Sequence, residues 1–253
     1  MTSSPQWWLP VPAELGGKVA LVTGVGRVGQ IGHAVARALG RGGAKLLLAD
    51  VNAVGLADRV KEFAAEGIVA KASPGDLTQP DAARAAVAAA RAQHGRLDVV
   101  VNVAGGFFSF GPFTEVTPEI LDRELSVNFK TAFFMCQAAV PALLEHGGGG
   151  AIINFASIAA VRSLMHMAAY GSAKSAVAGL TRALAREYRD AGIRVNAVAP
   201  ATVRTADNIA QMHPDPTTPF VEIDEVVQTV LFLASDAASG ITGQIVPITG
   251  KAY

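Results

Sequence analysis

The sequence predicts a single α/β domain: a doubly wound parallel sheet of about seven strands with helices on both faces. Short runs rich in Val, Ile, Leu and Ala alternate with longer segments whose apolar residues recur every three or four positions. These segments are long enough to be crossover helices, which parallel strands require. A chain of 253 residues fits one such domain. We assign residues 18–253 to it and residues 1–17 to an N-terminal arm.

The first half of the chain gives three strands and three helices. Residues 18–23 form an apolar run that ends in glycines, typical of a strand buried on both faces. In residues 32–42 the apolar side chains fall at helical spacing, and residues 44–50 are again a continuous apolar run. The alternation continues with a helix at 52–66, a strand at 68–72 and a helix at 80–94.

The second half repeats the alternation. Its predicted elements are a strand at 97–103, one long helix at 118–145, a strand at 151–155, a helix at 168–191, a strand at 193–198, a helix at 223–235 and a strand at 244–248. The glycines at 147–150 predict a loop between the long helix and the next strand. Ligands of such sheets bind at the carboxyl ends of the strands, and the motifs below follow strand ends.

Composition limits the classes of partner. The 21 basic and 21 acidic residues give a formal net charge of +0, so we expect neither nucleic acid nor an anionic membrane as a partner. The one cysteine, Cys136, lies in an apolar helical pattern and predicts a small buried side chain. The five histidines are scattered, so we predict no metal site. Without a secretory start or a membrane-length apolar run, a cytoplasmic protein is expected.

A glycine-rich loop joins the first strand to the first helix. Glycines there allow a tight turn and let backbone N–H groups and the helix N-terminus approach a pyrophosphate, although an ordinary tight turn uses the same residues. The candidate phosphate-binding positions are Gly24, Gly26, Arg27, Gly29, Ile31 and Gly32.

Asp50 closes the second predicted strand, where a carboxylate can accept hydrogen bonds from a ribose diol. A 2′-phosphate would meet a like charge there, with a repulsion on the order of 4 kcal/mol at ~4 Å and an effective dielectric of ~20. The sequence therefore favours NAD(H). NADP(H) stays possible, because the Arg27 guanidinium can pair with a phosphate.

Tyr170 and Lys174 are four residues apart in a predicted helix, which places them on one face. A free tyrosine has a pKa of ~10, and moving it near 7 needs about 4 kcal/mol of differential stabilisation. A nearby ammonium and a positive nicotinamide ring both perturb a phenol in that direction. We therefore expect an acidic Tyr170 that serves as acid and base, although a chance pair at this spacing is the alternative.

These motifs resemble those of the short-chain dehydrogenase/reductase family, from Gly17 to Ile248. Ser157 lies thirteen residues before Tyr170, as in the family, and Asn128 matches its helix asparagine. The glycine loop is two residues longer than the family pattern, with Gln30 in place of the middle glycine. The resemblance implies a Rossmann fold and the catalytic residues Asn128, Ser157, Tyr170 and Lys174.

The resemblance also implies further cofactor contacts. Asp76 and Leu77 match the positions that hold the adenine. The other implied positions are Asn102, Ala104 and Gly105 after the fourth strand, Pro200, Val203 and Thr205 after the sixth, and Tyr170 and Lys174 themselves. In the implied reaction Tyr170 exchanges a proton with the substrate oxygen while hydride moves between nicotinamide and carbon.

The substrate is less defined. The leading specific prediction is a 3-oxoacyl thioester reductase, and secondary alcohol, sugar or steroid dehydrogenases are alternatives. A dinucleotide-sensing protein without catalysis is a further one. Phe107, Phe108, Phe110 and Phe113 follow the fourth strand, near the expected pocket. The proline-rich residues 206–219 stand where the family has a substrate lid and predict an open site. The family's long helices, here 118–145 and 168–191, imply a homotetramer, with a dimer as the alternative.

Overall fold

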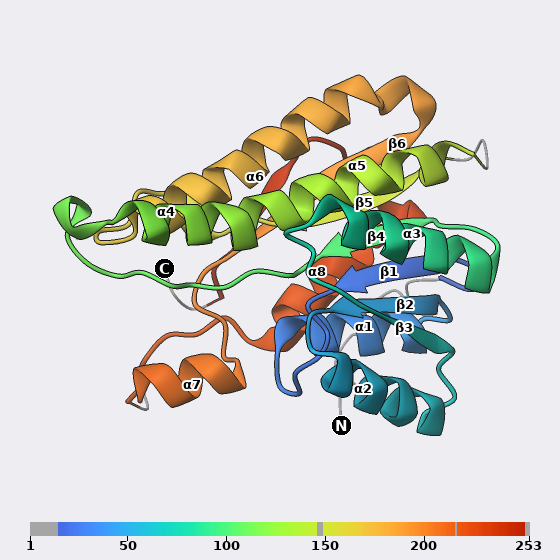
Figure 1. The fold of residues 1–253 in the computed structure, drawn as a ribbon, viewed down its shortest axis with the longest axis horizontal. Coiled ribbons are helices and arrows are strands. Elements are labelled where there is room, and N and C mark those ends of the chain that lie inside the picture. The colour runs from blue at the N-terminus through green and yellow to red at the C-terminus, as the bar shows by residue number, and fades with distance from the viewer. Residues whose placement is uncertain (1–14, 146–148, 216, 251–253) are drawn as a thin grey trace, which may run out of the picture.

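The computed structural model describes residues 15–145, 149–215 and 217–250. It contains a seven-stranded sheet in the order β3-β2-β1-β4-β5-β6-β7, with every neighbouring pair parallel (Figure 1). The strands are β1 Val19–Thr23, β2 Lys45–Asp50, β3 Ala70–Pro74, β4 Val99–Asn102, β5 Gly150–Phe155, β6 Ile193–Pro200 and β7 Ile245–Ile248. The predicted doubly wound sheet is confirmed.

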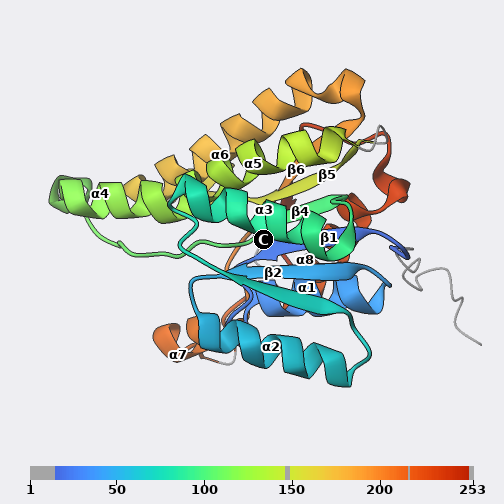
Figure 2. The same ribbon diagram turned by 45° about the vertical axis from the view of Figure 1, so that its right-hand side comes forward.

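Helices cover both faces of the sheet. They are α1 Ile31–Arg41, α2 Ala53–Ala65, α3 Pro80–His94, α4 Pro118–Leu125, α5 Thr131–Leu144, α6 Ala168–Glu187, α7 Ala206–Met212 and α8 Ile223–Ala234. Helices α1, α2 and α8 lie on one face and α3, α5 and α6 on the other, as both views show (Figure 2). Each face has its own apolar core, in which α1 contributes Leu39 and α5 contributes Met135. Cys136, 1% exposed, belongs to the second core, as predicted.

The strand order reverses between β1 and β4, which are neighbours in the sheet. Such a switch point separates the loops that follow the two strands and leaves a crevice at their carboxyl ends. Helices α4 and α7 extend beyond this edge of the sheet (Figure 1). The topology therefore brings the glycine loop, the loop after β4 and the segment around α7 to one end of the molecule.

The long helix predicted at 118–145 is three segments. A π-helical turn, Ser126–Lys130, separates α4 from α5. The stretch Pro118–Leu144 is long and apolar enough to cross a membrane by composition, with a mean hydropathy of 1.3, but half of that window is buried. Since α5 packs beside α3 and against the strands β4 and β5, the buried part of this stretch belongs to the core.

Other element bounds differ more modestly from the predictions. Strand β3 begins two residues later than expected, because Ile68 packs into the core before the strand starts. Helix α6 ends at Glu187 and is followed by a 3-10 turn, Arg189–Ala191. The segment 206–219 contains the helix α7, which its prolines did not suggest. The predicted N-terminal arm falls almost entirely outside the described residues.

Candidate active site

Tyr170, Ser157 and Lys174 come together at the carboxyl end of β5. Ser157 follows this strand, is 8% exposed and shares a hydrogen bond with Tyr170. Lys174 Nζ lies 5.8 Å from the centroid of the Tyr170 ring and donates to the backbone oxygen of Phe155 at 2.9 Å. The spacing on α6 thus places the phenol, the hydroxyl and the ammonium around one point, as the sequence predicted.

The acidity expected of Tyr170 depends on Lys174 and on a bound nicotinamide, and it stays a prediction; in the chain by itself the pKa of the phenol is shifted upward. Burial raises the pKa of Tyr170 above its ordinary value, the hydrogen bond with Ser157 lowers it, and the charge of Glu124 raises it again. Burial also lowers the pKa of Lys174 to about 8, while Glu124 acts to raise it. For both groups burial is the largest cause, because it disfavours the charged form of each.

Asn128 lies in the π-helical turn and is 1% exposed. Its Oδ1 accepts from the backbone N–H of Gly106 at 3.1 Å, and its Nδ2 donates to Glu124 Oε2 at 2.8 Å. The turn gives the mid-helix asparagine its structural reason, since π-bulges interrupt the regular ladder and often mark functional sites. Glu124, which sequence reasoning missed, is fully buried one turn earlier.

The glycine loop contacts both β2 and the loop after β4. Asp50 accepts from the backbone N–H of Gly26 at 2.8 Å through Oδ2 and from that of Asn52 at 2.8 Å through Oδ1. Gly32 must be glycine, because a Cβ there would lie 2.1 Å from the oxygen of Gly24. Gly24 has a φ of +74°, a conformation that favours glycine. This packing brings the start of α1 close to β1, as a phosphate-binding turn requires.

The extra length of the loop reaches the α7 segment. Arg27 forms an ion pair with Asp207, and the oxygen of Gly29 accepts from the backbone N–H of Ala206 at 3.1 Å. Arg27, the residue that keeps NADP(H) possible, is thus directed toward α7 and not toward Asp50. The ion pair is largely exposed, so it is a weak restraint.

Two of the positions implied for the cofactor turn their side chains inward. Asn102 donates to Asn154 Oδ1 at 2.8 Å and is 4% exposed, while Leu77 packs in the core beneath α3. Only the backbone of these residues is left for a ligand. Asp76 is exposed, and its Oδ1 accepts from the backbone N–H of Thr78 in the turn after β3; the N-cap of α3 is Gln79. The remaining predicted positions, Ala104, Gly105, Ile31 and Pro200, lie at the carboxyl edge of the sheet or at the start of α1.

Val203 and Thr205 lie between β6 and α7. Val203 pairs with Val221 in an isolated parallel bridge and is 3% exposed. Thr205 is the N-cap of α7, where its Oγ1 accepts from the backbone N–H of Asn208 at 3.2 Å. The residues after β6 that the resemblance implies as cofactor contacts are therefore fixed at both ends of the segment. They leave the backbone and the Thr205 hydroxyl as the groups that can contact a ligand.

The site fits a nicotinamide dinucleotide. Lys174 is 5% exposed, and among the described residues its ammonium makes one hydrogen bond, so donors remain for ribose hydroxyls. A Cβ on Gly105 would lie 3.3 Å from Lys174 Nζ and 2.9 Å from Asn128 Oδ1, which only a glycine avoids. Within the part of the chain that the structure describes, no group of three His, Cys, Asp or Glu side chains suited to a metal ion is present.

Aromatic and aliphatic side chains gather in the two loops beside Tyr170. Phe107 meets the Tyr170 ring edge-on, with 5.1 Å between centroids. Phe110 contacts the His166 ring at 5.4 Å, and the backbone N–H of Gly111 donates to the oxygen of His166 at 3.0 Å. These contacts join the loop after β4 to the loop before α6. We call the exposed side chains Phe107, Phe110, Leu164 and Met165 the apolar wall.

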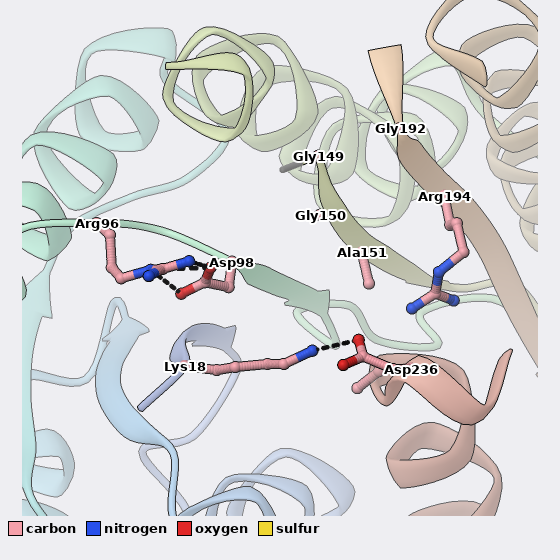
Figure 3. A pocket seen from close by; sticks show the side chains of 10 residues that line it. Lys18, Arg96, Asp98, Gly149, Gly150, Ala151, Gly192, Arg194 and Asp236 are labelled. Carbon is pink, nitrogen blue, oxygen red and sulfur yellow. Dashed lines mark hydrogen bonds and ion pairs between the residues drawn. The ribbon is translucent and has the colours of Figure 1, made fainter. Parts of the chain in front are cut away.

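A polar hollow of about 260 Å³ lies at the opposite edge of the sheet and does not belong to this site (Figure 3). Lys18 pairs with Asp236 and Arg96 with Asp98, while Arg194 donates to the backbone oxygens of Leu233 and Ser235. The charged side chains of this hollow form ion pairs with one another or hydrogen bonds to the backbone, so a structural role accounts for them.

Fold and site together define an oxidoreductase that uses a dinucleotide at the carboxyl edge of a parallel sheet. A family model described as Enoyl-(Acyl carrier protein) reductase matches residues 24–250. The chain belongs to the short-chain dehydrogenase/reductase family.

Two relatives and one solved structure illustrate the similarity. D-threitol dehydrogenase of Mycolicibacterium smegmatis is 34% identical, covering 99% of this chain and 98% of the relative. Cyclohexanol dehydrogenase of Acinetobacter sp. (strain SE19) is 35% identical, covering 92% and 94%. The structure of carveol dehydrogenase from Mycobacterium avium in complex with NAD has a TM-score of 0.85 at 26% identity, covering 95% of this chain and 99% of that one.

Proposed function

We propose that this enzyme is an NAD-dependent dehydrogenase of apolar secondary alcohols, which it oxidises to ketones. The observation that carries the proposal is the apolar wall, which begins with Phe107 against the Tyr170 ring. Binding there favours a substrate whose carbinol reaches the phenol while its hydrocarbon part covers aromatic and aliphatic side chains. Asp50 beside the glycine loop supports NAD over NADP, because its carboxylate suits a ribose diol.

The residues divide the chemistry as follows. Tyr170 takes the proton of the substrate hydroxyl, and Ser157, hydrogen-bonded to the phenol, is placed to bind the same substrate oxygen. Lys174 holds a positive charge under the site and offers donors to the ribose. Bound nicotinamide supplies the hydride acceptor. Ketone reduction is the reverse, with Tyr170 as the proton donor.

The relatives support an alcohol substrate more than the 3-oxoacyl thioester that the motifs first suggested. By their names, the two relatives are an alicyclic alcohol dehydrogenase and a sugar-alcohol dehydrogenase. A polyol is the second candidate, because the threitol enzyme matches over nearly the whole chain. The apolar wall favours the first, since it offers few hydrogen bonds to additional hydroxyl groups.

The experiment compares cyclohexanol, threitol and a 3-hydroxyacyl thioester by the appearance of the NADH absorbance band. We expect the highest kcat/KM with cyclohexanol. The variant Phe107→Ala should lower that kcat/KM by about tenfold, as for an aromatic ring whose contact with the substrate is worth roughly 1.5 kcal/mol. Phe113→Ala removes a more exposed ring from the same loop, so it is the matched control and should change kcat/KM less than twofold.

Preference for threitol would transfer the proposal to polyols, and preference for the thioester would restore the 3-oxoacyl substrate. Tight NADH binding without turnover of any of the three classes would instead support a dinucleotide sensor.

The tetramer also stays a proposal. The hollow between α5 and α6, lined by Phe133, Leu180 and Leu184 among others, supports a subunit contact on those helices, and light scattering tests it.

A further inference from the structure

Glu124 is a buried carboxylate that the motif of the family does not account for. It lies in α4, is 0% exposed, and receives three hydrogen bonds. A buried carboxylate without such partners would be strongly unfavourable, so the structure retains it only by satisfying it. Its contacts therefore indicate what it does.

The carboxylate joins two parts of the site that are separate in the sequence. Oε2 accepts from Asn128 Nδ2 at 2.8 Å, whereas Oε1 accepts from the Phe108 N–H at 2.9 Å and from Ser109 Oγ at 3.2 Å. Because Asn128 accepts from the Gly106 N–H, its amide is fixed at both ends. The loop held in this way carries Phe107 against Tyr170.

Glu124 also acts on the reacting groups through its charge. It is the charged group that affects both Tyr170 and Lys174, which face it from α6. The neighbouring cation on α4, Arg123, stacks on the Phe108 ring with 4.1 Å to its centroid, and Lys130 of the π-helical turn is exposed. The negative charge opposes the loss of the lysine proton that burial favours.

We propose that Glu124 is a positioning residue, whose carboxylate holds the Asn128 amide and residues 106–109 in register with Tyr170. This inference rests on the dehydrogenase function proposed above. The carboxylate does not touch the reacting atoms. It acts through the residues that do.

The variant Glu124→Gln removes the charge and presents a donor where an acceptor is needed. We expect kcat to fall about 10- to 100-fold, with KM for NAD⁺ changed less than threefold. The rising limb of the pH profile for oxidation should move to lower pH, because the charge that raises the pKa of Tyr170 is gone. Glu119→Gln, exposed on the same helix, is the control and should match the unmodified enzyme.

A double variant that exchanges the carboxylate and the amide distinguishes a loss of positioning from a general loss of structure. In Glu124→Gln combined with Asn128→Asp, the new amide oxygen at position 124 accepts from Phe108 and Ser109. The new amide nitrogen donates to the new carboxylate at position 128, which still accepts from Gly106. We expect this pair to recover at least a third of the lost kcat. If the single variant does not fold, the double variant decides: a folded, active protein supports the proposal, and an unfolded or inactive one overturns it.

Amide hydrogen exchange gives a readout that needs no substrate. In Glu124→Gln, the amides of Gly106 and Phe108 should exchange at least tenfold faster, while those of β4 stay unchanged. This outcome can hold even if no alcohol in the panel is turned over, so failure of the proposed function is distinguishable. A single variant with unchanged kcat, pH profile and exchange would overturn the inference.

Discussion

Replacing Asp50 by Asn tests how the enzyme distinguishes NAD from NADP. The two carboxylate oxygens accept from the backbone N–H groups of Gly26 and Asn52, each at 2.8 Å. Asparagine keeps one acceptor in the same shape and removes the charge. A 2′-phosphate at ~4 Å from the carboxylate is repelled by about 4 kcal/mol at an effective dielectric of ~20. Asp50 is only half-buried, so solvent and salt reduce this to about 2 kcal/mol.

The expected change follows from that figure. A difference of about 2 kcal/mol corresponds to about 30-fold in the ratio of kcat/KM for NADP⁺ to that for NAD⁺. Steady-state rates with both cofactors, at low and at high salt, measure the ratio. The gain should shrink as salt rises, since the repulsion is screened. Asp58→Asn, an exposed charge on α2, is the control for a change of net charge alone.

Arg27 supplies the second half of this test. Its ion pair with Asp207 directs it away from Asp50. Asp207→Asn should release the guanidinium and raise the same ratio a further two- to fivefold, because an exposed ion pair is worth under about 1 kcal/mol. A ratio that Asp50→Asn leaves within twofold of the unmodified enzyme, or an unmodified enzyme that already prefers NADP⁺, would refute the electrostatic argument.

Three further outcomes are expected. Gly32→Ala should lower Tm and weaken NADH binding measured by fluorescence, because the new Cβ would lie 2.1 Å from the Gly24 oxygen; full retention of both would contradict the packing described. Burial and neighbouring arginines lower the pKa of His33 to about 4, so stability is complete above its unfolded value of 6.5 and is lost as the pH falls toward 4. Urea unfolding at pH 7 and pH 5 should therefore differ by about 2 kcal/mol from this group, and His33→Gln should remove that part of the difference. Tyr170→Phe should lower kcat at least a thousandfold while NADH binding changes little, and comparable turnover would exclude the phenol as acid and base.

The sequence was sufficient for the architecture because each signal was local. Continuous apolar runs such as 44–50 and the helical spacing in α1 required no knowledge of the rest of the chain. The same holds for the pair Tyr170 and Lys174, whose spacing on one helix fixes their common face. The carboxyl edge of the sheet then followed from the parallel topology, which places the strand ends together.

The parts that sequence reasoning missed depend on contacts between distant segments. Sequence reasoning assigned no role to Glu124, because its partners Phe108 and Ser109 lie in the loop after β4. The ion pair of Arg27 with Asp207 spans 180 positions of the chain. The π-helical turn has no separate signature either, since the residues of 126–130 suit an ordinary helix. A single sequence contains no direct record of such pairings.

The pKa of Tyr170 in the chain by itself is not determined by the local spacing of tyrosine and lysine alone. A lysine one turn away suggested a phenol with a lowered pKa, yet burial and the charge of Glu124 raise it. A protonated phenol is the form that gives a proton to a ketone oxygen. Oxidation needs the opposite protonation state, so its kcat/KM should increase toward alkaline pH. The charge of Glu124 opposes the base form, whereas its hydrogen bonds fix Asn128 and the loop that carries Phe107 against Tyr170.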